Sequence, residues 1–306
     1  MDSPVSADSE RPLVDPQLGQ RGKLGKSWQF FRTWPVIPVA IISILLIFAI
    51  FAPFIANHNP ERGDLFFRNV PPSWDAEGSA KFLLGTDPLG RDIWSRIVFG
   101  ARISIIVAGI VLTFGATGGV IIGLIAGYRG GNIDEILMRI VDLTFAIPFI
   151  LVALVVVIVM GQSMTVIIIL LIAFSWGGFA RQVRGEALAL RNRDYVLMAQ
   201  ILGGSSPYII YRHILPGVIN TVLVIGSLRV GSLILAEAIL SYLGVGVPPP
   251  TPAWGAMVSE GRDYISSAWW VTFFPGVAIF LTVLAFNFLG DWLRDYFDPR
   301  LRQLMH

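Results

Sequence analysis

Residues of the types that enzymes use for catalysis are scarce in this sequence of 306 residues, which has no cysteine and three histidines. His58, His213 and His306 lie on different segments, so their spacing does not predict a metal site. Residues 25–27 (Gly-Lys-Ser) could end a phosphate-binding P-loop, but Gln20 stands where that motif requires its first glycine. The spacing of Ser, His and Asp residues does not predict a catalytic triad. We therefore expect a non-catalytic chain with no metal or cofactor of its own.

Charged residues inside apolar segments are the remaining candidates for function. Arg229 and Glu237 lie in one apolar run, where a charge at the bilayer centre costs at least about 2.5–3.5 kcal/mol. Their separation places them about 80° apart around a helix, so they need not pair with each other. Two interpretations stay open: they line a translocation pathway, or each makes a structural hydrogen bond to a neighbouring helix or subunit.

The composition indicates the environment that must hold these residues. The chain is 54% hydrophobic and 14% charged, with a mean hydropathy of +0.68. Soluble proteins carry about 25% charged residues, so this chain has too few charges to cover a surface in water. A nucleic-acid partner is not expected, because the 23 basic residues are scattered among 21 acidic ones. The sequence therefore predicts an integral membrane protein.

Six apolar runs are long enough, at about 20 residues, to cross the bilayer as helices. They cover residues 36–55, 103–126, 140–160, 164–179, 218–243 and 270–289. The expected fold is all-α with six transmembrane helices. We divide the chain into an N-terminal tail (1–35), a first transmembrane helix (36–56), an outer loop (57–102), a core of five transmembrane helices (103–290) that includes an inner loop (181–217), and a C-terminal tail (291–306).

The distribution of Lys and Arg predicts the orientation of these spans. If the N-terminus is inside, 15 of the 23 basic residues fall on the inner side and seven on the outer side, while Arg229 lies within a span. Positive residues are retained on the cytoplasmic side of a membrane. Both termini are therefore expected in the cytoplasm.

The inner loop is predicted to form two short helices. The first runs from about residue 186 to 202 and ends at Gly203-Gly204, where glycine can adopt a left-handed conformation. The second begins at Ser205-Ser206 and continues to about His213, before Leu215-Pro216 redirects the chain into the fifth span. Such an elbow, with exposed apolar residues ringed by arginines, suits the docking of a soluble partner. The alternative is a basic loop lying on lipid headgroups.

Other segments carry weaker predictions. Gly119 and Gly123 have the spacing that allows close helix packing. Asp142 is expected to stabilise a helix dipole, and Trp269-Trp270 to mark the membrane interface. In the outer loop, Gly85 and Gly90 indicate a compact turn. The charges expected to pair locally at the membrane surface are Arg91, Arg96, Arg102, Asp87 and Asp92.

The inner loop resembles the conserved cytosolic loop of ATP-binding-cassette (ABC) importer permeases. That pattern is Glu-Ala-Ala, three residues, Gly, nine residues, Ile, any residue, Leu-Pro. The residues that match it are Ala199, Gly203, Leu215 and Pro216. Leu197 and Met198 replace the Glu and the first Ala, and His213 replaces the Ile. By this resemblance the loop is a coupling helix that fits a cleft of an ATPase subunit, and the missing Glu puts one polar contact in doubt.

Several further motifs resemble the C-type permease of dipeptide, oligopeptide and nickel importers. They are Leu84-Gly85-Thr86-Asp87, Gly90-Arg91-Asp92, Ser95-Arg96, Gly100, Arg102-Ile103-Ser104, Leu240 to Gly244, Trp254 to Met257, Phe274-Pro275-Gly276, Asn287 to Asp291, Leu293-Arg294-Asp295 and Asp298-Pro299-Arg300. The resemblance covers roughly residues 30–302.

This resemblance implies a type I ABC importer permease-like fold that forms half of a translocation pathway in a bacterial inner membrane. The implied partners are a B-type permease, two ABC ATPase subunits that carry ATP and Mg, and an extracytoplasmic solute-binding protein. Di- and oligopeptides are the expected solutes, with nickel chelates, glutathione and opines as alternatives. A rival of a different class is a secondary transporter driven by an ion gradient, which would need several intramembrane acids.

Overall fold

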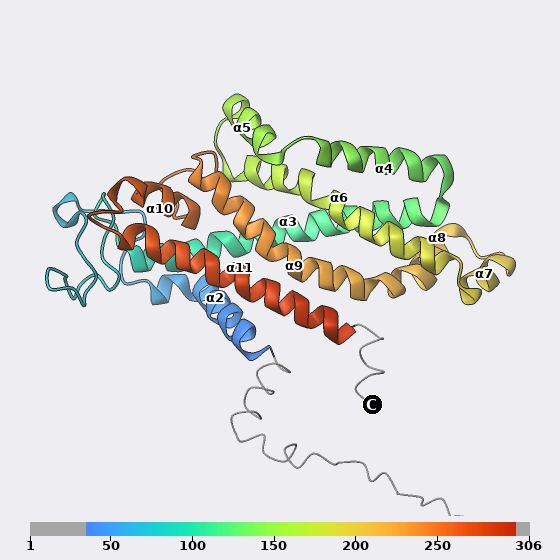
Figure 1. The fold of residues 1–306 in the computed structure, drawn as a ribbon, viewed down its shortest axis with the longest axis horizontal. Coiled ribbons are helices and arrows are strands. Elements are labelled where there is room, and N and C mark those ends of the chain that lie inside the picture. The colour runs from blue at the N-terminus through green and yellow to red at the C-terminus, as the bar shows by residue number, and fades with distance from the viewer. Residues whose placement is uncertain (1–34, 298–306) are drawn as a thin grey trace, which may run out of the picture. The chain divides into compact units, whose positions relative to one another are not determined.

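The structure is a computed structural model that describes residues 35–297, so the predicted N-terminal tail (1–35) lies almost wholly outside the described residues. The predicted C-terminal tail (291–306) lies partly outside them, because residues 291–297 form the end of the last helix. The described residues from 37 onward group into one compact unit. Within the described range every regular element is helical, and one isolated β-bridge joins Thr86 to Asp92. Figure 1 shows the helices in chain order. They are α2 (Val36–Ile55), α3 (Ile93–Arg129), α4 (Gly131–Ala146), α5 (Phe149–Met160), α6 (Met164–Arg191), α7 (Asp194–Ile201), α8 (Ser206–Ile209), α9 (Leu215–Tyr242), α10 (Trp254–Gly261) and α11 (Trp270–Phe297), with short turns η2 (Leu65–Phe67), η3 (Ile210–Ile214) and η4 (Arg262–Tyr264).

Five helical segments of the described chain are long and apolar enough to cross a membrane, and a bent pair of helices makes the sixth. The prediction of one continuous helix over 140–160 is wrong, because α4 and α5 meet at an angle of 79°. Pro148 causes this break: it has no N–H to donate, and it favours an extended conformation at the preceding residue, Ile147. With the bent pair taken as one span, the expected six spans are present.

Several helices extend beyond their apolar runs. Helix α3 begins at Ile93, ten residues before the predicted span, because the Asp92 side chain accepts a hydrogen bond from the backbone N–H of Ser95 and caps the helix. The first turns of α3 therefore lie within the predicted outer loop, 57–102. Hydropathy marks only the part of a helix that suits hydrocarbon, whereas backbone hydrogen bonding continues past it.

Glycines allow α3 to pack closely against α6. A Cβ added at Gly119 would lie 2.6 Å from the Cβ of Phe179, and one at Gly123 would lie 2.6 Å from the backbone oxygen of Ala180. Gly115 and Gly127 face α6 in the same way. The predicted close packing at Gly119 and Gly123 is confirmed, and it belongs to a stripe of four glycines spaced one turn apart.

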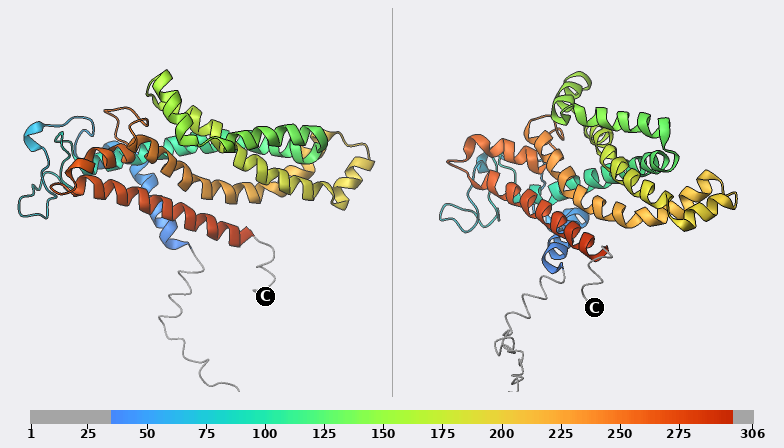
Figure 2. Two further views of the ribbon diagram at one scale, coloured as in Figure 1. Left: turned by 45° about the horizontal axis from the view of Figure 1, so that its top comes forward. Right: turned by 45° about the vertical axis from the view of Figure 1, so that its right-hand side comes forward.

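The segment between α6 and α9, residues 192–214, is called the elbow below. Residues 186–191 are the last turn of α6, and a separate helix, α7, begins at Asp194, so the predicted single helix over 186–202 is wrong. Nor does Leu215-Pro216 redirect the chain, because helix continues from Ser206 to Tyr242. A π-helical turn at η3, in which the Leu215 N–H reaches the Ile210 carbonyl oxygen, accommodates the proline ring. Figure 2 shows the elbow and the 56–92 loop at opposite ends of the long helices.

Candidate functional site

The end of α7 has a defined hydrogen-bonding geometry. Gly203 is left-handed, with φ of +80°. Its N–H donates to the Gln200 carbonyl oxygen, and the Gly204 N–H donates to the Ala199 carbonyl oxygen, each over 3.0 Å. These two bonds form a Schellman motif, which ends a helix and needs a glycine or asparagine at the left-handed position. Ala199 and Gly203, two residues of the matched pattern, therefore occupy the two key positions of one helix-ending turn.

The elbow is anchored to the long helices by a small apolar cluster. Val196, Ile209 and Ile214 are fully buried there and pack with Val183 of α6 and Leu124 of α3. Ala199 and Leu215 lie at the edge of the same cluster, while Pro216 is exposed in the first turn of α9. A displacement of α7 would therefore be transmitted to the ends of α3, α6 and α9, because packed side chains resist compression.

The outer surface of the elbow is apolar. Met198, Ile201 and Leu202 are 58%, 77% and 83% exposed. Water-exposed apolar side chains that form a contiguous group mark a surface that is covered by a partner or by lipid. This surface is compatible with both interpretations of the inner loop from the sequence: docking of a soluble partner, and contact with lipid headgroups.

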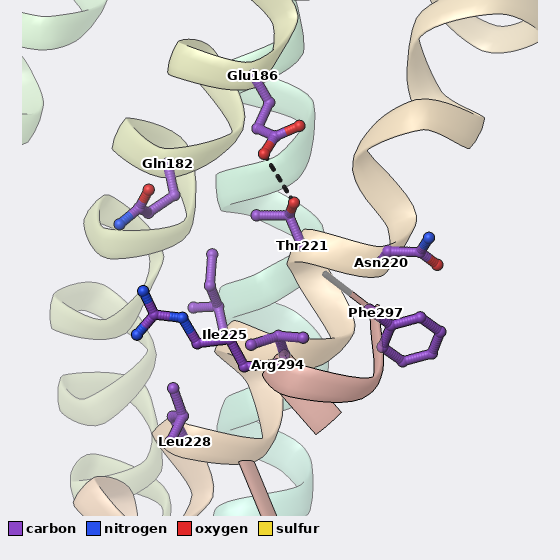
Figure 3. Close-up of a pocket in the computed structure, with 9 residues that line it drawn as sticks. Gln182, Glu186, Asn220, Thr221, Ile225, Leu228, Arg294 and Phe297 are labelled. Atoms are coloured by element: carbon purple, nitrogen blue, oxygen red, sulfur yellow. Dashed lines mark hydrogen bonds between the residues drawn. The ribbon is translucent and has the colours of Figure 1, made fainter. Parts of the chain in front are cut away.

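A polar groove follows the boundary between α6 and α9 from the elbow end. Figure 3 shows a cavity of about 460 Å³ with Gln182 and Glu186 of α6 on one wall. Thr221 and Asn220 of α9 and Arg294 of α11 line other parts of it. The Thr221 hydroxyl donates to the Glu186 carboxylate over 2.9 Å. The sequence interpretation missed this groove, although polar residues four apart on α6 could have indicated it.

Arg229 lies in a second cavity, of about 350 Å³, farther along α9. Its walls include Ser175 and Phe174 of α6, and Phe149 beside the α4–α5 break. The guanidinium lies directly against Gly178, where an added Cβ would overlap it. Within residues 35–297, Arg229 has neither a hydrogen-bond acceptor nor an ion-pair partner. It is therefore a half-buried cation that opens into a cavity, and no described residue supplies its counter-ion.

Glu237 is placed differently from Arg229. It is 1% exposed, and one carboxylate oxygen accepts a hydrogen bond from the Ser241 hydroxyl over 2.7 Å. The other oxygen is buried and has no donor among the described residues. Glu237 lines none of the cavities described above, so its position matches the structural alternative more closely than a pathway lining.

A buried charge cluster joins the loop before α3 to α10. Arg91 contacts Asp87 over 2.6 Å and Glu260 over 2.7 Å, and Arg96 pairs with the same two acids. Asp87, Arg91 and Arg96 are at most 5% exposed. The predicted local pairing of Arg91 and Arg96 with Asp87 is confirmed, but the prediction of a surface position is wrong, because the cluster is buried and takes one acid from a distant segment. No sequence pattern indicated Glu260.

Other residues of the predicted surface pairs and interface have different roles. Asp92 caps α3 and accepts hydrogen bonds from Ser95, while Arg102 is exposed. Trp270 is 5% exposed and donates to the Thr86 carbonyl oxygen over 3.1 Å, so its prediction as an interface residue is wrong, whereas Trp269 is exposed. Gly85 and Gly90 have φ of +82° and +73°, which confirms the compact turn.

Ion pairs connect α4 to α6 near the elbow end. Arg184 pairs with Asp134 through two hydrogen bonds of 2.5 and 2.6 Å, and Arg181 pairs with Asp142 over 2.7 Å. Asp142 lies well past the first turn of α4, so the prediction that it stabilises the helix dipole is wrong. The prediction assumed a helix that began near 140, but α4 starts at Gly131.

The helical fold and its apolar segments define a multi-pass membrane protein. The family model described as "binding-protein-dependent transport system inner membrane component" matches residues 119–303, and the chain belongs to this family of ABC transporter permeases. It is 36% identical over 300 residues to the di/tripeptide transport system permease protein DppC of Pseudomonas aeruginosa, covering 97% of this chain and 99% of that relative.

Two other relatives are similarly close. The glutathione transport system permease protein GsiD of Pectobacterium atrosepticum is 46% identical over 224 residues, which are 73% of this chain and 74% of the relative. The dipeptide transport system permease protein DppC of Bacillus subtilis is 40% identical over 252 residues, which are 82% of this chain and 77% of the relative. These alignments support the predicted resemblance to C-type permeases.

Proposed function

We propose that this chain is the C-type permease subunit of an ATP-driven importer of di- and oligopeptides in a bacterial inner membrane. It forms half of the translocation pathway beside a B-type permease. Two ABC ATPase subunits that carry ATP and Mg dock on the elbow, an extracytoplasmic solute-binding protein delivers the solute, and both termini are cytoplasmic. The names of the relatives support peptides as the solute class, and they keep glutathione as an alternative. Nickel chelates and opines are the other alternative solutes, and a transport assay with each compound distinguishes among them.

The observation that carries this proposal is the construction of the elbow. Its outer surface is apolar at Met198, Ile201 and Leu202, while its inner side is anchored to the membrane helices through Val196 and Ile209. An ATPase bound to that surface would move α7, and the cluster would transmit the movement to α3, α6 and α9. Ala199, Gly203, Leu215 and Pro216 set the shape of this coupling loop. Inside the membrane, Arg229 lines the pathway.

The test is mass spectrometry of the proteins that co-purify with the tagged chain from its native membrane in mild detergent. We expect a second six-helix permease and P-loop ATPases. Replacing Ile201 with Asp buries an unpaired carboxylate in the docking surface and should release the ATPases while the second permease remains. The control is Phe66→Asp, since Phe66 is 86% exposed and belongs to η2 in the 56–92 loop. Figure 2 shows that loop at the opposite end of the long helices from the elbow. A lone chain that still transports would instead favour a secondary transporter.

A further inference from the structure

The cavity beside Arg229 holds an unpaired cation far from either membrane surface. Arg229 lies at the midpoint of α9 (Leu215–Tyr242), about 20 Å along the helix from each end. Phospholipid headgroups cannot reach that depth without deforming the bilayer. A charge at such a depth is expensive unless it faces a polar path or a counter-ion. Any counter-ion of Arg229 must therefore come from outside residues 35–297, and without one the guanidinium must face a polar path.

The position of the guanidinium group is set by its neighbour on α6. Gly178 has no side chain, and an added Cβ would lie 2.7 Å from Cζ of Arg229 and closer still to Nη2. On α6, positions 174, 175 and 178 lie within about one turn of each other. The missing side chain at Gly178 thus makes room for the arginine beside the cavity that Phe174 and Ser175 line.

The rest of the cavity suits a small organic solute. Ser232 adds a hydroxyl group, and Phe149 and Phe174 form an aromatic wall with ring centroids 5.2 Å apart. Its volume of about 350 Å³ lies within the range of about 300–1,000 Å³ that is typical of ligand sites. An arginine binds carboxylates with paired, charge-assisted hydrogen bonds. One cation, one hydroxyl and an apolar wall match a molecule with one carboxylate and apolar side chains.

We propose that Arg229 binds a carboxylate group of the transported solute while the solute crosses the membrane. This inference rests on the proposed permease function and adds the chemistry of the solute: a small carboxylate-bearing molecule, such as a peptide with a free C-terminus. An acidic side chain of the neighbouring permease is the competing counter-ion. A permanent protein partner of that kind would act in assembly, and would leave the Ser232 hydroxyl and the aromatic wall of the cavity without a role.

The direct test is chemical modification of arginine in the purified complex. Phenylglyoxal reacts with accessible guanidinium groups, and peptide mass spectrometry reports the rate at each arginine. Dialanine at millimolar concentration should slow the reaction at Arg229 severalfold, whereas its C-terminal amide should not. Arg139, whose side chain is 77% exposed, serves as an internal control that neither compound protects. Equal protection by both compounds, or protection by neither, overturns the inference.

Transport measurements with variants provide the second test. Loss of a charge-assisted hydrogen bond predicts that Arg229→Met lowers dialanine uptake by about tenfold or more, with the thermal midpoint of the complex unchanged. Gly178→Ala displaces the guanidinium without removing its charge and should also lower uptake. The matched controls are Arg139→Met and Gly185→Ala, because a Cβ at Gly185 meets no atom within 4 Å.

The outcomes separate this inference from the proposed function. If Arg229→Met releases the second permease or lowers the thermal midpoint, the counter-ion is an acid of that subunit and the inference is overturned. Uptake of dialanine that is unchanged in Arg229→Met also overturns it, while the permease function stands. If the unaltered complex transports nothing with ATP, the proposed function fails, and the protection of Arg229 by dialanine still reports whether the cavity binds a carboxylate.

Discussion

Replacement of Gly203 by alanine tests whether the elbow couples ATP hydrolysis to transport. At φ of +80°, an alanine at this position is strained by about 1–2 kcal/mol, although its Cβ would meet no atom within 4 Å. The strain therefore acts on the backbone alone. It should raise the population in which the Gly203–Gln200 and Gly204–Ala199 hydrogen bonds are open by about 5- to 30-fold. Hydrogen exchange at the Gly203 and Gly204 amides measures that factor directly.

The chain offers a matched control for this strain. Gly161, just after α5, has φ of +82°, and its Cβ would also meet no atom within 4 Å. Gly161→Ala therefore introduces the same backbone strain away from the elbow. Gly203→Asn should restore much of the wild-type behaviour, because asparagine tolerates the left-handed conformation better than alanine does.

The assay is the number of solute molecules imported per ATP hydrolysed by the complex in proteoliposomes. We expect this ratio to fall in Gly203→Ala, to recover in Gly203→Asn and to stay at the wild-type value in Gly161→Ala, with the same amount of each chain in the membrane. The reasoning is refuted if hydrogen exchange at Gly203 accelerates as calculated but the transport ratio does not change, or if Gly161→Ala lowers the ratio equally.

Three further predictions concern stability. Glu260→Gln leaves Arg91 and Arg96 with uncompensated charge and should destabilise the folded chain by about 3 kcal/mol. This is the low end of the cost of breaking a buried ion pair, because the Glu260 side chain is 30% exposed. A thermal melt measures the effect, and Glu135→Gln, at an exposed position, should change the melting midpoint little. Gly119→Leu should overpack the contact between α3 and α6, which should destabilise the folded chain by about 1–3 kcal/mol or more and reduce the amount of the protein in membranes. The Gly118→Leu variant, in which the new side chain enters open space, should be present in membranes at the normal amount. Trp254→Phe removes the hydrogen bond from the indole N–H to the Ile97 carbonyl oxygen and should cost about 1 kcal/mol in the same melt, so an unchanged midpoint would contradict a structural role for that bond.

Local features of the sequence predicted much of the elbow but not its exact helices. Gly203-Gly204 was predicted to end a helix, and the Schellman hydrogen bonds at that point agree with it. The start of α7 was missed because most of residues 186–202 are good helix formers, although Asn192 and Asp194 at the break are not and could have indicated it. Pro216 was overinterpreted as a turn, because a π-helical segment can accommodate a proline ring that a regular α-helix cannot.

The sequence alone determined the membrane location, the number of apolar spans and the close packing of α3 at its glycines, because hydropathy and residue size are properties of a single segment. Only the tertiary structure decided which polar side chains meet. It placed Glu260 against Arg91 and Arg96, buried Glu237 beside Ser241, and left Arg229 in a cavity where residues 35–297 supply no counter-ion. These outcomes depend on how each helix is rotated and which helix packs beside it. That arrangement minimises the free energy of the whole packed chain, so residues up to 184 positions apart in the sequence come into contact.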